Sequence, residues 1–285
     1  MQVFSSIEQL SPLLKAHKTA TTTLGFVPTM GALHQGHLSL VKKALDENDA
    51  VVVSIFVNPT QFNNKNDLKN YPRTLDADIK TLSSIAAEKE IFVYTPTADE
   101  IYPNGLSSEK YSFDGLENEM EGKYRSGHFD GVATVVNRFF TLIEPDKAYF
   151  GEKDFQQLQI VKKMTAIKNL SVTIVSCPIS REPSGLAMSS RNKRLSQKEL
   201  KEAAFIYRVL NRVRKDFGIK NAQEIHDWVA QQFYKNDVLE LEYFQIADET
   251  TLKSLPDTET KKTNARAFIA VYAGDVRLID NIALN

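Results

Sequence analysis

Short apolar runs alternate with longer segments of helical periodicity over the first two thirds of the chain. The strand-like runs are residues 23–29, 50–57, 91–94, 147–150 and 171–176. Apolar residues at helical spacing predict helices between them, over residues 36–47, 74–87, 129–143 and 155–168. The run AVVVSIFV is continuously apolar, as expected of a parallel strand covered on both faces. This alternation predicts an α/β fold with a doubly wound parallel sheet, which binds ligands at the carboxyl ends of its strands.

The pattern changes after about residue 177. SQKE, which begins at Ser196, is a capping box and predicts a helix that ends near Gly218, and NAQE predicts the start of a second helix. The later elements are predicted strands over residues 239–246, 266–273 and 276–282, with a polar surface loop over 257–264. We therefore predict a Rossmann-like domain over residues 1–177 and a smaller α+β domain over 178–285.

Composition narrows the classes of partner. The 35 basic and 36 acidic side chains give a net charge of −1, so no general field attracts nucleic acid or an anionic membrane. The only cysteine, Cys177, excludes an intrachain disulfide and a cysteine-based metal site, which fits a reducing cytoplasm. No signal-peptide pattern and no long apolar segment is present. We expect a cytoplasmic protein with small-molecule partners and with neither nucleic-acid nor membrane partners.

The stretch PTMGALHQGHLSL joins the first predicted strand to the first predicted helix. Free amides and the helix dipole favour a phosphate at this point, and Gly31 and Gly36 allow close approach. His34 and His37 are three residues apart and can point toward the same anion. Two alternatives stay open from the residues alone. The histidines could be surface or capping residues, or they could form a metal pair, although no third ligand of suitable spacing is evident and no metal site is predicted.

Two further polar stretches follow strand-like runs. FVNPTQF presents Asn58 and Gln61 as neutral donors and acceptors, which suit a small hydroxy acid. FGEKDFQQ carries Lys153, a mobile point charge of the type used on phosphates, and Gln157 one helical turn later. Each stretch alone is explained as well by an ordinary loop or a solvated charge.

Two more stretches complete the set. GLAMSSRN combines the hydroxyls of Ser189 and Ser190 with the guanidinium of Arg191, which suits a polyphosphate. EGKYRSGHFDGVATVV places His128 and several cationic residues before a strongly apolar helix. Because the carboxyl ends of parallel strands share one edge of a sheet, the joint occurrence of these stretches indicates one binding site.

The ordered stretches between residues 28 and 192, together with YPR, resemble the pantothenate synthetase (pantoate–β-alanine ligase) family. This family belongs to the HIGH-type nucleotidyltransferase superfamily. The resemblance implies an AMP-forming ligase that condenses pantoate with β-alanine through a pantoyl adenylate and releases pyrophosphate. It also implies a homodimer, ATP as a substrate, and Mg²⁺ that bridges phosphates with mostly water and phosphate ligands.

The resemblance also implies site residues. ATP contacts carry over to Met30, Gly31, Ala32, Leu33, His34, Gln35, Gly36, His37, Gly151, Glu152, Lys153, Asp154, Ser180, Met188, Ser189, Ser190 and Arg191. The implied catalytic residues are His34, His37 and Lys153, with His37 as proton donor. Pantoate contacts fall on Gln61 and Gln157, and Gln61 also borders the β-alanine position. Asn58 joins this substrate set because of its place in FVNPTQF.

Three points remain expectations. A site that forms an adenylate must exclude water, and the domain after residue 177 is expected to act as a lid. Asp78 is a candidate helper, although a solvated helix carboxylate is the simpler interpretation. The chain also has Ser126 and Ser184 where the family usually has proline and aspartate, which puts any role of that aspartate in doubt.

Two competing functions stay open. One is a nucleotidyltransferase of the same superfamily that stops at an adenylylated or cytidylylated product, which has less use for the paired amides of NPTQ and KDFQQ. The other is a non-catalytic nucleotide-sensing or RNA-binding module. The balanced charge and the absence of a basic stripe with interleaved aromatic residues disfavour it.

Overall fold

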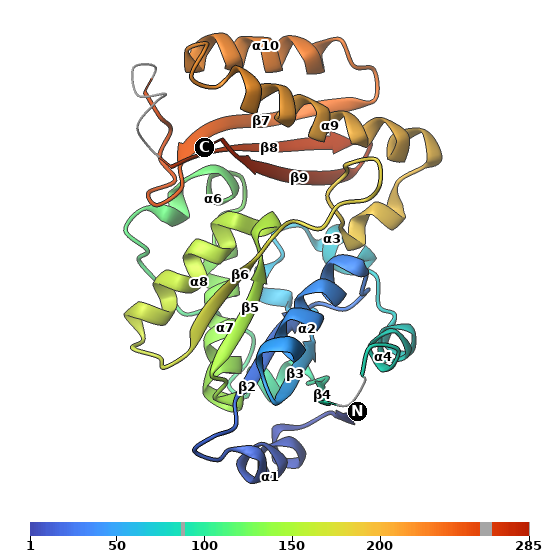
Figure 1. Cartoon of the computed structure of the whole chain (residues 1–285), viewed down its shortest axis with the longest axis vertical. Coiled ribbons are helices and arrows are strands. Elements are labelled where there is room, and N and C mark those ends of the chain that lie inside the picture. Colours follow the sequence, from blue (N-terminus) through green and yellow to red (C-terminus); the bar gives the residue numbers. More distant parts are fainter. Residues whose placement is uncertain (87–88, 257–263, 285) are drawn as a thin grey trace. The chain divides into compact units, whose positions relative to one another are not determined.

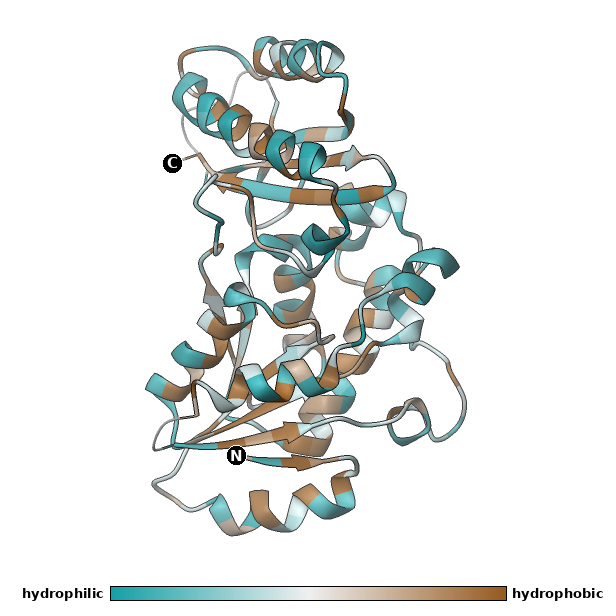
Figure 2. Cartoon of the chain, turned by 90° about the vertical axis from the view of Figure 1, so that its right-hand side faces the viewer, coloured by the Kyte–Doolittle hydropathy of each residue, from teal (hydrophilic) through white to brown (hydrophobic). Residues whose placement is uncertain are grey.

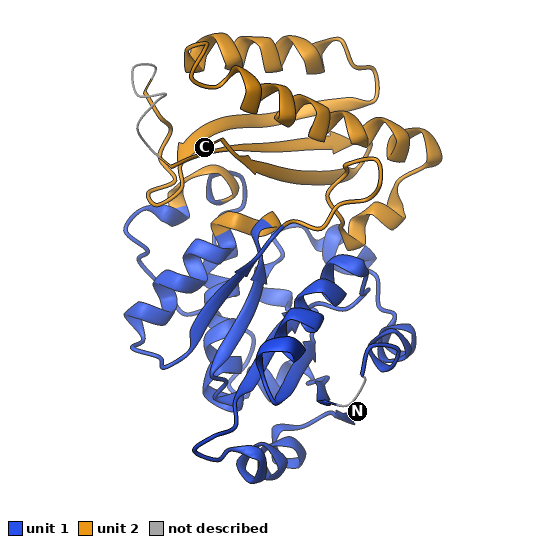
Figure 3. Cartoon of the chain, in the orientation of Figure 1, with its two compact units in different colours: residues 1–117, 122–152, 157–178 blue, residues 118–121, 153–156, 179–285 orange. Residues whose placement is uncertain are grey.

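The computed structural model describes residues 1–86, 89–256 and 264–284 (Figure 1). Its contacts divide the chain into two compact units (Figure 3). Unit 1 comprises residues 1–117, 122–152 and 157–178, and unit 2 comprises residues 118–121, 153–156 and 179–285. The functional division into an ATP-binding domain over 1–177 and a lid over 178–285 stays a prediction.

Unit 1 is built on a six-stranded parallel sheet with the strand order β1-β4-β3-β2-β5-β6. The strands are β1 (Gln2–Phe4), β2 (Leu24–Thr29), β3 (Ala50–Ile55), β4 (Glu90–Tyr94), β5 (Lys147–Gly151) and β6 (Thr173–Cys177). From β2 the chain moves to β3 and β4 on one side and then returns to β5 and β6 on the other. The strand order therefore reverses between β2 and β5, and the predicted doubly wound parallel sheet is confirmed.

Helices lie on both faces of this sheet. The helices up to residue 167 are α1 (Ile7–His17), α2 (Gln35–Glu47), α3 (Lys65–Asn70), α4 (Leu75–Ser83), α5 (Ala98–Ile101), α6 (Met120–Tyr124), α7 (His128–Ile143) and α8 (Phe155–Ile167). Val51 and Val53 share a core with Val41 of α2, whereas Phe26 packs against Phe139 of α7 with ring centroids 5.5 Å apart. Strands buried on both faces need apolar side chains in both directions, and these strands are largely brown in Figure 2.

Two parts of unit 1 differ from the sequence prediction. The helix expected over 74–87 ends at Ser83, and residues 87–88 lie outside the described residues. The first 22 residues, for which the pattern gave no element, contain β1 and α1. β1 is a three-residue edge strand whose first two residues are exposed, so it carries no apolar run. The start of α1 has a signal, since the Ser6 hydroxyl accepts a hydrogen bond from the Gln9 amide.

Unit 2 is an antiparallel sheet of β7 (Leu239–Asp248), β8 (Ala265–Ala273) and β9 (Val276–Ala283), covered on one face by α9 (Gln197–Asp216) and α10 (Ala222–Tyr234) (Figure 1). The predicted capping box at Ser196 is present, and the predicted helix start at NAQE also forms a capping box, at Asn221. α9 buries Val209, Leu210 and Val213 in a core that it shares with the sheet. Residues 257–263 of the predicted surface loop lie outside the described residues.

Two short segments join unit 2 although their sequence neighbours belong to unit 1. In the first, Glu121 forms an ion pair with Arg277 of β9 at 2.7 Å. In the second, Phe155 packs against Phe268 of β8 with ring centroids 5.8 Å apart, and the Gln156 side chain accepts a hydrogen bond from the Glu121 amide at 3.0 Å. After β5, the chain therefore enters unit 2 again at Lys153.

Candidate active site

The loop after β2 has an unusual backbone. Gly31 and Ala32 have φ angles of +78° and +50°, so two consecutive residues are left-handed. Ala32 carries a Cβ that disfavours this region, and the conformation needs compensating contacts. The Asp78 carboxylate provides them, because Oδ2 accepts from the Ala32 amide at 2.9 Å and Oδ1 accepts from the Leu33 amide at 2.8 Å. Asp78 of α4 thus holds the amides of Ala32 and Leu33, and the Thr29 hydroxyl accepts from the Gly31 amide at 3.2 Å.

Asp78 is 3% exposed, and the expectation of a solvated helix carboxylate is wrong. The reason is its position four residues before Leu82, a fully buried residue on the same face of α4. Thr74 at the helix N-cap also donates to Asp78, at 3.2 Å. Its spacing from a buried leucine is the sequence signal that could have identified this residue.

His34 and His37 lie at the start of α2. His34 is the N-cap residue, and its Nδ1 accepts a hydrogen bond from the Gly36 amide at 3.1 Å. An accepting Nδ1 places the proton of the neutral ring on Nε2. The two imidazole rings lie side by side with centroids 4.0 Å apart and planes tilted by 37°. The capping interpretation is therefore correct for His34, and the cap makes Nε2 the donor nitrogen of this ring.

The metal-pair alternative gains no support from the neighbourhood of these rings. Within residues 1–86, 89–256 and 264–284, no group of three or more histidine, cysteine, aspartate or glutamate side chains is placed to hold a metal ion.

Helices within the same residues are all too short or too polar to cross a membrane.

Gln61 occupies a short 3₁₀ turn, η1 (Pro59–Gln61), that follows β3. Asn58 precedes this turn, is 1% exposed, and donates through Nδ2 to Gln61 Oε1 at 3.2 Å. The other end of the Gln61 amide donates to the Met30 sulfur at 2.9 Å. The polar stretches after β2 and β3 are therefore in direct contact, and both ends of the Gln61 amide are oriented.

Residues distant in sequence hold Asn58 and the backbone of Gln61 in place. The Tyr102 hydroxyl donates to Asn58 Oδ1 at 2.7 Å, and burial raises the pKa of Tyr102 so that it stays a neutral donor. Asn58 Nδ2 also lies 3.2 Å from the carbonyl of Gly131 in α7. His128 binds the Gln61 carbonyl through Nδ1 at 2.8 Å, which requires the proton on Nδ1 because a carbonyl only accepts. Tyr102 carried no sequence signal.

Gly151 ends β5, the strand next to β2 where the strand order reverses, and Glu152 begins the 3₁₀ turn η3 (Glu152–Asp154). Gln157 lies further on, in α8, and is half-buried. Unit 1 thus contains the predicted residues Met30 to His37, the pair Asn58 and Gln61, and Gly151, Glu152 and Gln157. Among them, contacts join Met30, Asn58 and Gln61.

Unit 2 contains the remaining predicted residues, Lys153, Asp154, Ser180, Met188, Ser189, Ser190 and Arg191. Ser180 and Met188 close a hairpin, since the Met188 amide donates to the Ser180 carbonyl at 3.0 Å. Ser189 then caps the 3₁₀ turn η4 (Ser190–Arg194), with its hydroxyl accepting from the Arg191 amide at 3.3 Å. The Lys153 side chain is 19% exposed, and its ammonium lies 3.7 Å from the Asp154 carboxylate.

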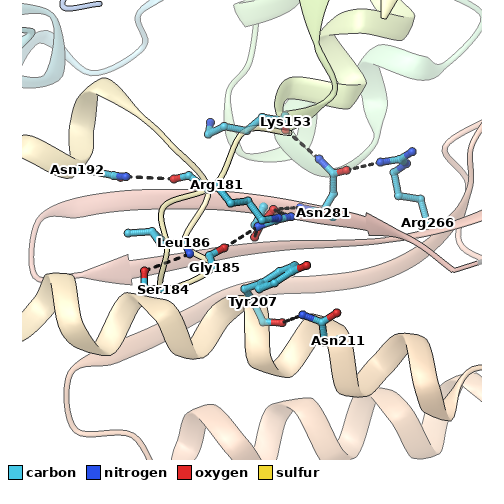
Figure 4. Close-up of polar contacts among 12 residues, drawn as sticks. Lys153, Arg181, Ser184, Gly185, Leu186, Asn192, Tyr207, Asn211, Arg266 and Asn281 are labelled. Carbon is cyan, nitrogen blue, oxygen red and sulfur yellow. Dashed lines mark hydrogen bonds and ion pairs between the residues drawn. The ribbon is translucent and has the colours of Figure 1, made fainter. Parts of the chain in front are cut away.

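The hairpin is anchored by residues that the sequence analysis missed (Figure 4). Arg181 forms a two-pronged ion pair with Asp280 of β9, at 2.6 and 2.9 Å, and its guanidinium lies 3.9 Å above the ring of Tyr207. Asp280 is 4% exposed, and burial raises its pKa while Arg181 opposes that effect. Gly185, with φ +92°, fits against the same tyrosine, because a Cβ there would lie 2.4 Å from the ring.

Comparison with known proteins identifies the family. The model of the pantoate-beta-alanine ligase family matches residues 2–283. The pantothenate synthetase of Christiangramia forsetii is 53% identical over 285 residues, covering 100% of both chains. The crystal structure of pantothenate synthetase from Thermus thermophilus superposes with a TM-score of 0.90 at 38% identity, covering 100% of this chain and 99% of that one.

A second solved structure is that of a pantoate-beta-alanine ligase from Francisella tularensis complexed with β,γ ATP and β-alanine. It superposes with a TM-score of 0.82 at 38% identity, covering 100% of this chain and 98% of that chain. The chain belongs to the pantoate–β-alanine ligase family, and its activity is the ATP-dependent condensation of pantoate with β-alanine to pantothenate.

Proposed function

We propose that the condensation proceeds in two steps through a pantoyl adenylate. The pantoate carboxylate attacks the α-phosphorus of ATP and displaces pyrophosphate, and the β-alanine amine then attacks the acyl carbon and displaces AMP. The observation that carries this proposal is the paired imidazoles at the N-terminus of α2, beside the reversal of strand order between β2 and β5. Helix N-termini at such reversals favour phosphate groups.

The charge that develops in the first step defines the roles of the ATP-binding residues. Negative charge accumulates on the α-phosphate and on the leaving pyrophosphate, so donors and cations fixed in advance lower the barrier. We assign His37 as proton donor, with His34 beside it, and Lys153 as a cation on the phosphates. Ser189, Ser190 and Arg191 complete the polyphosphate contacts. The remaining ATP contacts are the residues of Met30–His37 and Gly151–Asp154 already named, Ser180 and Met188.

Pantoate binds to Gln61 and Gln157 in this proposal, and β-alanine enters beside Gln61. Asn58 acts differently from a direct ligand, because it is buried and its amide is bonded to Gln61, Gly131 and Tyr102. We infer that Asn58 acts on pantoate through the orientation of the Gln61 amide. A neutral amide niche accommodates a hydroxy acid without competing for the charge that the phosphates need.

Mg²⁺ is the counter-ion that we propose for ATP. It would neutralise charge on the phosphate oxygens. We expect phosphate oxygens and water to supply most of its ligands. A chelator should therefore abolish turnover without lowering the melting temperature of the ligand-free protein.

Two assignments concern the protein as a whole. We propose that unit 2 protects the adenylate from water, because a free acyl adenylate hydrolyses. Solution scattering with and without an ATP analogue tests this, and an unchanged distance between units would contradict it. We also propose a homodimer, as the family resemblance implies. Light scattering should then give a mass twice that of the chain, which is 32.1 kDa.

The decisive experiment separates the two half-reactions. Purified protein with ATP, Mg²⁺ and pantoate should release pyrophosphate and accumulate bound adenylate, and β-alanine should then release AMP and pantothenate. AMP release without an amine, or transfer of a nucleotide to pantoate as the final product, would indicate the competing nucleotidyltransferase reaction.

A further inference from the structure

Asn281 of β9 is buried at the meeting point of two predicted phosphate-binding segments. It is 2% exposed, and its Nδ2 donates to the carbonyl of Lys153 at 2.9 Å. Its Oδ1 accepts from Arg266 at 2.6 Å, so both ends of the amide are fixed. All three residues belong to unit 2, and Figure 4 shows the chain of contacts from Lys153 through Asn281 to Arg266.

Asp280, the residue before Asn281, is bonded to the hairpin between Ser180 and Met188 through Arg181. Asp280 accepts two hydrogen bonds from Arg181, and its Oδ1 also accepts from the Asn281 amide at 2.7 Å. Arg181 in turn donates to the Gly185 carbonyl at 3.0 Å and to the Asn281 carbonyl at 3.3 Å. A guanidinium with this many fixed partners holds the hairpin between Ser180 and Met188 in one conformation.

The hairpin is in turn bonded to the 3₁₀ turn η4 that follows it. The Asn192 side chain donates to the Ala187 carbonyl at 3.1 Å, which ties η4 to the hairpin, and η4 also packs against β9. Lys153 and the Ser189–Arg191 segment are 36 or more positions apart in the sequence. Lys153 is bonded directly to Asn281, and the segment is linked to the preceding residue, Asp280, through the hairpin and Arg181.

We propose that Asp280 and Asn281 are positioning residues for the first half-reaction, which hold Lys153 and the Ser189–Arg191 segment in a fixed mutual arrangement matched to the triphosphate. This inference rests on the proposed function, because that proposal assigns Lys153, Ser189, Ser190 and Arg191 to ATP. Phosphate-binding segments that are fixed in advance need not rearrange when negative charge develops on the phosphates in the transition state. If the two segments become mobile, this rearrangement raises the barrier.

The test replaces the Asn281 amide. Asn281→Asp keeps the shape and the acceptor for Arg266, but an oxygen then faces the Lys153 carbonyl in place of a donor. We expect an approximately tenfold slower pyrophosphate release and a raised KM for ATP, with the KM values for pantoate and β-alanine unchanged. The matched control is Gln245→Glu, an amide-to-acid change in β7 of the same sheet, where the side chain donates to the Leu252 carbonyl at 3.2 Å. The control should leave all three KM values unchanged.

A double substitution separates positioning from general stability. In a Lys153→Ala background, Asn281→Asp should have much less effect on pyrophosphate release than it has in the parent protein, because no Lys153 side chain remains to be positioned. Fully additive losses, or equal rises of KM for ATP and pantoate, would overturn the inference. If Lys153→Ala itself has no effect, the proposed role of Lys153 fails instead.

A measurement on the unaltered protein avoids any folding defect of the variants. Amide hydrogen exchange should slow together at Asn281 and across residues 180–188 when a non-hydrolysable ATP analogue binds, while α10 is unaffected. Slowing in residues 180–188 without a change at Asn281 would show that the hairpin responds alone, and the inference would be wrong.

Discussion

The loop after β2 and the hairpin of unit 2 are held in different ways. The loop takes its position from the strand end before it and the helix start after it, and one carboxylate, Asp78, binds the amides of Ala32, which is left-handed, and of Leu33. The hairpin lies outside the secondary-structure elements of its own unit and depends on contacts with residues remote in sequence, among them Tyr207 of α9. Its anchor is an ion pair between Arg181 and Asp280, 99 positions apart in sequence.

The two regions obtain their geometry from different sources. In a doubly wound sheet the architecture itself brings strand ends together, so short motifs at those ends suffice. In an antiparallel unit the same precision needs buried ionic contacts between remote residues, which cost desolvation and are therefore placed where geometry is critical.

The largest effect is expected when one phosphate-binding group is removed from either unit. His37→Ala in unit 1 and Lys153→Ala in unit 2 should each slow pyrophosphate release on the order of 10²-fold or more, because each removes a fixed donor or cation from the developing charge. Stopped-flow or coupled pyrophosphate assays measure this directly. The double variant should lose less than the product of the two single losses, since both groups act in one transition state.

Controls for these two variants come from exposed residues of the same types. His226→Ala on α10 and Lys162→Ala on α8 replace exposed side chains and should leave the rate unchanged. Pyrophosphate release at the parent rate in Lys153→Ala would remove unit 2 from the first half-reaction, and the comparison between the two anchors would lose its functional meaning.

The second effect tests the anchor of the unit 1 loop. Asp78→Asn puts an NH₂ group where a carboxylate oxygen accepts from the amides of Ala32 or Leu33, so one amide faces a donor. A lost hydrogen bond to a buried charged group costs about 1.5–3 kcal/mol, which predicts a loss of roughly 10- to 100-fold in pyrophosphate release and a lower melting temperature. Asp76→Asn, at an exposed position of the same helix, is the control. An unaltered rate would mean that the loop keeps its conformation without this carboxylate.

Much of the framework is predictable from the sequence because the buried strands and capped helices carry strong local signals. The run AVVVSIFV and the capping box at Ser196 each specify an element from adjacent residues. The strand-end motifs also identify the candidate ligands of ATP and pantoate. These features share one property, which is that their physical cause lies within a few positions.

The supporting residues are not predictable in this way. Tyr102 reaches Asn58 across 44 positions, and Asn281 reaches Lys153 across 128 positions. An isolated tyrosine or asparagine gives no periodic or motif signal, and its role exists only once the chain has folded. Asp78 is intermediate, since its spacing from Leu82 indicates the buried face but does not indicate the amides that it binds.

A third effect concerns the packing of α7 against the turn that carries Gln61. A Cβ at Gly131 would lie 2.5 Å from the Thr60 carbonyl oxygen, so Gly131→Ala must displace either the helix or η1. We expect about a tenfold higher KM for pantoate with the KM for ATP unchanged, because overpacking of this kind costs about 1–3 kcal/mol. Thr141→Ala, at the exposed end of the same helix, should change neither constant. Parallel rises in both constants would indicate general destabilisation instead of a local shift of Gln61.

The smallest effect is expected at Cys177, the last residue of β6, two positions before unit 2 resumes at Ile179. The side chain is 3% exposed, and burial raises the pKa of the thiol from its ordinary 9.0 to about 11. At pH 8 the thiolate fraction is on the order of 0.001, so iodoacetamide should label the folded protein very slowly and the urea-unfolded chain readily. Because the folded-state pKa is the higher one, the stabilisation from the protonated thiol is complete below pH 9 and is lost as the pH rises toward 11. Labelling should therefore accelerate mainly above pH 10, and mass spectrometry of the adduct measures it. Rapid labelling at pH 8 would mean that the end of β6 opens readily, and that the junction between the two units is less ordered than either anchor.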